Sequence, residues 1–87
     1  MEFEWDENKR IINLAKHNFD FADAVFVFDD PYRIENIDDR KNYGEIRINT
    51  VGLFKNEVIV AVVHTDRNGI TRIISARRAS SLYYGNR

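Results

Sequence analysis

The residues best suited to chemistry lie in the second half of the chain, where arginines interrupt apolar, strand-like segments. Residues 58–63 form a continuous apolar run rich in β-branched side chains, and Asn68-Gly69 is the strongest two-residue signal for a β-hairpin turn. Residues 70–78 form the returning strand. It carries Arg72, Arg77 and Arg78. A central hairpin with several guanidinium groups indicates a site for an anion such as a phosphate.

Tight turns predict which of these side chains share a face of the sheet. Two-residue turns at Asn68-Gly69 and Lys55-Asn56 would place His64 opposite Ile73 on one side and opposite Arg47 on the other. Alternation along each strand then predicts one polar and one apolar face. The predicted polar face carries Arg47, Asn49, His64, Ser75 and Arg77. The predicted apolar face, which would pack on helices, carries Ile46, Ile48, Ile59, Val63, Ile74 and Ala76.

Structural roles compete with these chemical ones. A histidine at the end of an apolar strand, such as His64, is more often half-buried and hydrogen-bonded than catalytic. Arg47 and Arg77 could form ion pairs with carboxylates nearby in the sequence. His17 lies near the predicted end of a helix, where the helix dipole favours a cationic imidazole, and this favours a structural role.

The composition limits the kind of protein. Eighty-seven residues make one small domain, 1–87, close to the size at which burial only just exceeds chain entropy, so a habitual partner is expected. The absence of cysteine excludes disulfides and thiolate zinc sites, and two histidines make a poor metal centre, so we expect no cofactor. No signal pattern and no membrane-length apolar run occur, which predicts a soluble cytoplasmic protein that does not contact a membrane.

Charge is divided unevenly along the chain. Residues 1–43 hold 11 acidic and 6 basic side chains, whereas residues 44–87 hold 3 acidic and 7 basic ones. One surface for an anion such as nucleic acid and another for a basic partner would explain this division. A solvated surface whose charges happen to segregate is the alternative.

The element pattern predicts the α+β class, with two N-terminal helices packed on a four-stranded antiparallel sheet. Asp6 can cap a first helix over 7–17, whose apolar side would carry Ile11, Ile12, Leu14 and Ala15. Asp20 can cap a second helix that ends before Pro31. Strands are expected over 32–37 and 44–54, followed by the hairpin described above. The tail from residue 79 onward could begin a short C-terminal helix.

Taken together, these residues resemble the BrnT family of bacterial type II toxins, over nearly the whole chain. The order and spacing of several short pieces carry the resemblance, although each piece is weak alone. They are Phe3-Glu4-Trp5-Asp6-Glu7, Asn13, Lys16-His17, Phe21-Ala22-Asp23-Ala24, Val27-Phe28-Asp29-Asp30-Pro31, Asp39-Arg40, Tyr43-Gly44-Glu45, Val51-Gly52-Leu53, His64-Thr65-Asp66-Arg67 and Arg72-Ile73-Ile74-Ser75-Ala76-Arg77.

The resemblance implies a fold similar to RelE-type ribonucleases and a function. The protein would be a metal-independent endoribonuclease that cuts RNA through attack of a 2′-hydroxyl and so inhibits translation. Its partner would be a BrnA-like antitoxin with a ribbon-helix-helix domain. The toxin would be bound to operator DNA only through this antitoxin. A heterotetramer, with two antitoxins dimerised between two toxins, is the implied assembly.

On the predicted register, Arg47 and Arg77 would bind the phosphate and His64 would be the general acid or base. The residues expected to bind RNA around them are Arg40, Asn49, Arg72, Ser75 and Arg78. Two other functions stay open on the sequence. One is a non-catalytic module that binds the antitoxin or acts as operon co-repressor, and the other is a small phosphate or nucleotide binder.

Overall fold

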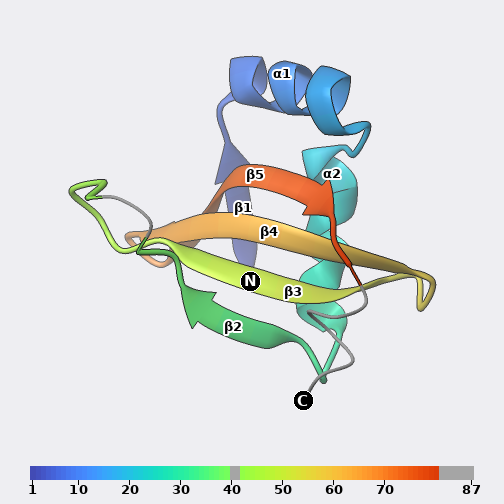
Figure 1. The fold of residues 1–87 in the computed structure, drawn as a ribbon. Coiled ribbons are helices and arrows are strands. Elements are labelled where there is room, and N and C mark those ends of the chain that lie inside the picture. The colour runs from blue at the N-terminus through green and yellow to red at the C-terminus, as the bar shows by residue number, and fades with distance from the viewer. Residues whose placement is uncertain (40–41, 81–87) are drawn as a thin grey trace.

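The computed structural model describes residues 1–39 and 42–80. Within them the chain runs β1 (Glu2–Trp5), α1 (Glu7–His17), α2 (Phe21–Ala24), a 3-10 helix η1 (Val25–Asp29), β2 (Ile34–Ile37), β3 (Ile48–Phe54), β4 (Val58–Arg67) and β5 (Ile70–Arg78). The described strands form one five-stranded sheet in the order β1-β5-β4-β3-β2 (Figure 1). The α+β class with two helices on a sheet is confirmed.

The sheet differs from the predicted four antiparallel strands because residues 2–5 add a fifth strand. β1 pairs with β5 in parallel, whereas the other neighbours are antiparallel, so the sheet is mixed. Phe3 and Trp5 on β1 pack against the core from alternate positions of the strand. The segment 2–5 has only four residues, two of them acidic, and this pattern is too short to predict a strand. The predicted C-terminal helix falls mainly on residues 81–87, outside the described residues.

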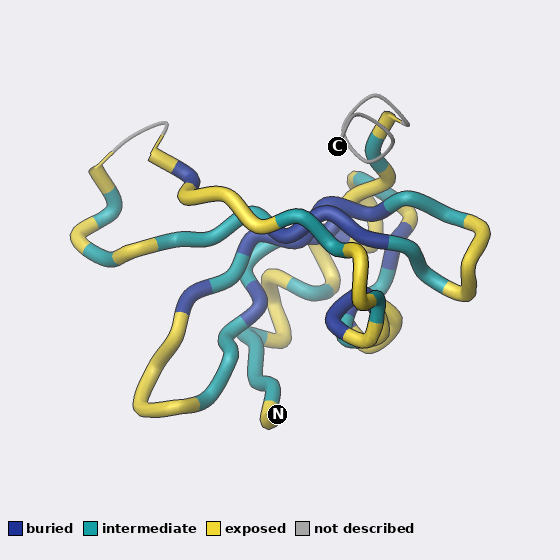
Figure 2. The backbone as a smooth tube through the Cα atoms, turned by 90° about the horizontal axis from the view of Figure 1, so that it is seen from below, coloured by how far each residue is buried: buried dark blue, intermediate teal, exposed yellow. Residues whose placement is uncertain are grey.

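The core lies between the sheet and the segment that contains α2 and η1. Figure 2 shows the buried stretches gathered at the middle of the strands, with exposed residues at the hairpin ends. Phe21 and Val27 are fully buried and meet Val60, Val62 and Ile73 from the sheet. The second helix was predicted as one element, but only its first turn is α-helical and the rest is 3-10.

Helix α1 has the predicted ends but not the predicted contacts. The Asp6 side chain accepts hydrogen bonds from the backbone N–H groups of residues 8 and 9, and Asn18 stops the helix in the left-handed conformation. The expected apolar side is exposed, since Ile11 is 54% and Ile12 64% accessible. The buried residue of α1 is instead Asn13, which hydrogen-bonds the edge of β5. The apolar-side prediction was therefore wrong.

The predicted pairing of β3 with β4 is off by one residue. The turn does form at Lys55-Asn56, both with positive φ, and the N–H of Glu57 donates to the carbonyl of Phe54. Glu57 is then left out of the ladder, so that Phe54 pairs with Val58. As a result Ile48, not an arginine, lies opposite His64.

A bulge changes the pairing of β4 with β5 as well. Near the turn the register is as predicted, with His64 opposite Ile73. The next pair is Val63 with Ser75, which leaves Ile74 as an extra residue. One extra residue reverses the facing of everything beyond it. Ser75 and Arg77 therefore lie on the face of the sheet opposite His64, and the predicted polar face does not exist as one set.

Candidate nucleic-acid interface

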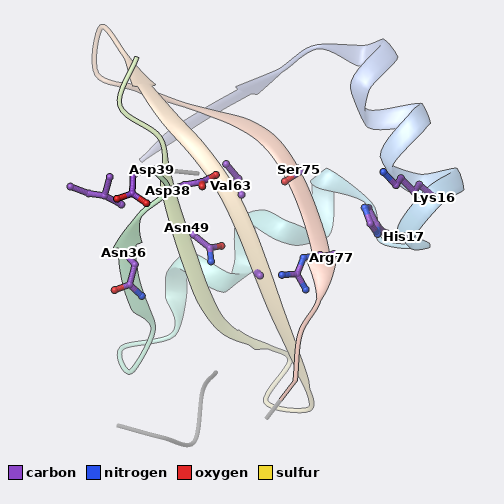
Figure 3. Close-up of a pocket in the computed structure, with 11 residues that line it drawn as sticks. Lys16, His17, Asn36, Asp38, Asp39, Asn49, Val63, Ser75 and Arg77 are labelled. Atoms are coloured by element: carbon purple, nitrogen blue, oxygen red, sulfur yellow. The ribbon is translucent and has the colours of Figure 1, made fainter. Parts of the chain in front are cut away.

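A groove of about 540 Å³ crosses the sheet face that the α2–η1 segment leaves open. Its floor comes from β3, β4 and β5, one wall from the end of β2 and the other from the end of α1 (Figure 3). The lining residues are Lys16, His17, Asn36, Ile37, Asp38, Asp39, Asn49, Ala61, Val63, Ser75 and Arg77. The bulge in β5 is what turns Ser75 and Arg77 into this groove.

One end of the groove is cationic, and its cations are not neutralised within the described residues. Lys16, His17 and Arg77 form no ion pair with any carboxylate of residues 1–39 and 42–80. Figure 3 shows the Arg77 side chain leaving β5 toward the middle of the groove, whereas Lys16 and His17, at the last turn of α1, lie on the other side of β5. Unpaired cations gathered at a concave surface favour binding of an anion.

Most other arginines among the described residues form ion pairs with carboxylates, whereas Arg77 does not. Arg10, Arg33, Arg47, Arg67 and Arg72 each have a carboxylate oxygen within ion-pair distance. These five guanidinium groups are therefore already engaged. Arg78, next to Arg77, is exposed and forms no ion pair among the described residues. In the strand register it lies opposite Val60, so its side chain is on the other face of the sheet.

The position of α1 at the groove follows from Asn13. Its side-chain amide bonds the backbone of Ala76 in both directions, at 2.7 Å and 3.2 Å. One helical turn beyond Asn13 come Lys16 and His17, and the strand residue after Ala76 is Arg77. The same contact therefore places the helix end and the arginine at the same groove.

Asn49 lies on the groove floor between β2 and β4, opposite Asn36 and Val63. Its Oδ1 is buried and has no hydrogen-bond partner among the described residues. A buried acceptor without a donor normally costs stability, so its retention is typical of a site under functional constraint. Ser75 adds a hydroxyl to the same floor.

The other end of the groove is acidic. Asp38 and Asp39 follow β2, which is separated from β5 by two strands. At a spacing of about 4.8 Å between strands, three spacings put these carboxylates roughly 14 Å from the β5 side. They therefore lie at the opposite end of the groove from the β5 backbone.

His64 is not in the groove. Its Nε2 lies 2.7 Å from the Thr50 hydroxyl, and its ring meets Phe28 edge to face with centroids 4.9 Å apart. Burial lowers the pKa of His64 below its ordinary value of 6.5, and the charge of Glu35 opposes this effect. These surroundings stabilise a neutral imidazole within the fold.

The remaining predicted site residues are dispersed. Arg47 stacks over the Tyr43 ring at 3.8 Å, and its Nε is 3.0 Å from Glu45, where it lowers the pKa of that carboxyl by hydrogen bonding. Arg72 is 3.0 Å from Glu4 across the β1–β5 pair. Arg40 lies outside the described residues. Of the predicted residues that the structure describes, only Asn49, Ser75 and Arg77 come together in the groove.

Sequence reasoning missed Lys16 and His17 as site residues. The helix dipole gave His17 a structural explanation, Lys16 was named only among the residues that carry the resemblance, and nothing in the local pattern shows that α1 ends beside β5. Among residues 1–39 and 42–80, no group of three or more metal-binding side chains occurs. No helix in the same described residues is long and apolar enough to cross a membrane.

The comparisons with known proteins agree with one another. The family model for the ribonuclease toxin BrnT of type II toxin-antitoxin systems matches residues 5–82. The crystal structure of the Brucella abortus ribonuclease toxin, BrnT, superposes with a TM-score of 0.69 at 32% identity, covering 92% of this chain and 97% of that chain. No curated protein matches the chain. The resemblance noted in the sequence motifs is thus confirmed, and the chain belongs to the BrnT family of ribonuclease toxins of type II toxin–antitoxin systems.

Proposed function

We propose that this protein is a metal-independent endoribonuclease that cuts RNA in the groove on the open sheet face and so inhibits translation. Membership of the family implies an RNA substrate and an antitoxin partner. The observation that carries the proposal is the pair of cations Lys16 and Arg77, which form no ion pair among the described residues and lie with the His17 imidazole at one end of that groove. The partner we propose is a BrnA-like ribbon-helix-helix antitoxin that neutralises the enzyme in a hetero-oligomer.

Arg77 is assigned to the scissile phosphate. Attack of a 2′-hydroxyl on the neighbouring phosphorus places extra negative charge on the phosphorane oxygens, and a guanidinium presents paired donors that match them. Lys16 adds a second cation at the same end of the groove. Each cation that contacts a phosphate also releases counterions, so binding should weaken with salt.

Asn49 and Ser75 are assigned to the nucleotides next to that phosphate. Both lie on the groove floor and both carry groups that hydrogen-bond sugars or base edges. A groove that runs across the sheet face suits single-stranded RNA, whose bases can be splayed apart. Arg47 and His64 are reassigned to structural roles, because both are engaged by neighbours away from the groove.

Cleavage of a single-stranded RNA by purified protein in the presence of EDTA tests the proposal. Arg77→Ala should lower the cleavage rate by about 10²- to 10³-fold, the typical cost of removing a donor to transition-state charge. Arg78→Ala is the matched control, since it removes the neighbouring unpaired arginine from the opposite face. Equal effects of the two substitutions would contradict the placement of the site.

The antitoxin is tested by growth of bacteria that express the chain alone or with the adjacent open reading frame. We expect arrest of growth and of bulk protein synthesis with the chain alone, and recovery with the partner. A folded chain that causes no arrest would favour a non-catalytic binding module. Arrest that survives Arg77→Ala would keep the toxin but reject the site.

A further inference from the structure

His17 has surroundings that differ from those of an ordinary helix-end histidine. It is half-buried and it lines the groove with Lys16 and Arg77, and its side chain has no hydrogen-bond or ion-pair partner among the described residues. In Figure 3 its ring lies on the Arg77 side of the groove, beside the strand that carries Ser75. A dipole-stabilising role would need none of these features.

Elimination among the groove residues points to the same side chain. Cleavage at neutral pH needs a group that readily gives and takes a proton, and imidazole is the side chain best suited to this. His64 is on the other face of the sheet, in contact with Phe28. Asp38 and Asp39 are roughly 14 Å from the β5 side of the groove, by three strand spacings. His17 is therefore the imidazole that lines the groove together with Arg77.

We propose that His17 is a catalytic residue that donates a proton to the leaving 5′-oxygen; this inference rests on the proposed function. The 2′-oxygen forms a bond to phosphorus while the bond from phosphorus to the 5′-oxygen breaks. Water takes the proton of the 2′-hydroxyl, and the imidazolium of His17 gives its proton to the departing 5′-oxygen. The products are a 2′,3′-cyclic phosphate and a 5′-hydroxyl, and His17 regains its proton from solvent.

Two matched RNA substrates test this role, one with a natural linkage and one with sulfur in place of the bridging 5′-oxygen. A thiol, with a pKa near 8.5, leaves without a proton donor, whereas an alkoxide does not leave readily. His17→Ala should slow cleavage of the natural linkage by about 10²- to 10⁴-fold, as expected for loss of a general acid. On the sulfur-bridged linkage the same variant should approach the wild-type rate.

Two variants serve as comparisons. His17→Gln keeps a polar side chain at the end of α1 and should behave like His17→Ala, which guards against a folding defect in the alanine variant. His64→Gln removes the other histidine and should cleave both substrates like the wild type. Equal losses of His17→Ala on both linkages, or no loss on either, would overturn the proton-donor role.

Failure of the inference and failure of the proposed function give different results. If the wild-type protein cuts neither substrate, the ribonuclease proposal falls and the His17 role falls with it. If the wild type cuts both and Arg77→Ala is impaired on both, but His17→Ala matches the wild type, only the role of His17 is rejected.

Discussion

The side-chain amide of Asn13 bonds both backbone groups of Ala76, 63 residues further along the chain. Its Nδ2 donates to the Ala76 carbonyl at 2.7 Å, and its Oδ1 accepts from the Ala76 N–H at 3.2 Å. Nδ2 also donates to the carbonyl of Phe19 at 3.0 Å. Ala76 lies beyond the last residue paired with β1, so the amide takes the place of a strand at that part of the β5 edge. One side chain thus completes the sheet and fixes α1 beside the groove.

Asn13→Ala should lower the free energy of unfolding by about 2 to 3 kcal/mol, because it leaves buried backbone groups without partners. It should also reduce RNA cleavage at temperatures where the variant is folded, since α1 is no longer held beside Arg77. Urea unfolding followed by circular dichroism gives the first quantity, and the cleavage assay gives the second.

Asn8→Ala is the control for that experiment. Asn8 is exposed on the same helix, and only its backbone N–H takes part in the Asp6 cap. Substitution should change stability by no more than about 0.5 kcal/mol. Similar losses in the two variants would mean that helix propensity, and not the Ala76 contact, explains the Asn13 effect.

Local signals predicted helix α1 and the β4–β5 hairpin, but not strand β1. The capping aspartate Asp6 and the left-handed Asn18 gave both ends of α1, and the Asn68-Gly69 turn gave the bounds of β5. Each of these signals depends on backbone preferences within a few residues, and such preferences can be read from the sequence.

The site depended on features that local signals do not contain. The extra residues Glu57 and Ile74 shift the ladder at two places, and each shift moves side chains to the other face. The shift in β5 places Ile73 and Ala76 on the same face, where both pack in the core with Val60 and Val62. The contact of Asn13 with Ala76 is equally non-local, so the placement of His17 and Arg77 in one groove could not be predicted.

Acidification should destabilise the protein partly through His64. Burial lowers its pKa in the folded state from the ordinary value of 6.5, so below that pH the unfolded chain binds more protons than the folded one. The stability contributed by the neutral ring is present above pH 6.5 and is lost as the pH falls toward the folded pKa. His64→Gln should therefore reduce the drop in the urea midpoint between about pH 7.5 and about pH 5.5.

His17→Gln is measured beside it, because it shows how much of the pH dependence belongs to the other histidine. Both variants keep every carboxylate, so the acid sensitivity that carboxylates cause is common to all samples. A pH dependence of His64→Gln as steep as that of the wild type would show that burial of this ring does not govern it.

Gly52 allows β3 to approach η1 closely, and Gly52→Ala should destabilise the fold. A Cβ at this position would lie 2.9 Å from Val27 Cγ1 and 3.2 Å from the Val27 carbonyl oxygen. Overpacking of this kind costs about 1 to 3 kcal/mol. A double-mutant cycle with Val27→Ala checks the cause, since removing Cγ1 should make the pair less destabilised than the sum of the single variants. Strict additivity would argue against the clash.

Asn49 should show opposite effects on stability and on activity. Its buried Oδ1 has no partner among the described residues, although the residue sits in a strand where a β-branched side chain would fit. Asn49→Val should therefore raise the free energy of unfolding by about 1 kcal/mol, since it removes an unsatisfied acceptor. The same variant should bind and cleave RNA less well, because the amide faces the groove.

Thermal unfolding and cleavage are measured on the same preparation, with Thr50→Val as the control. Thr50 is the buried neighbour of Asn49 on the other face of the sheet, and its hydroxyl contacts His64. That control should lose stability and keep the intrinsic cleavage rate. An Asn49→Val protein that is no more stable, or that cleaves RNA like the wild type, would show that this amide is not retained for the groove.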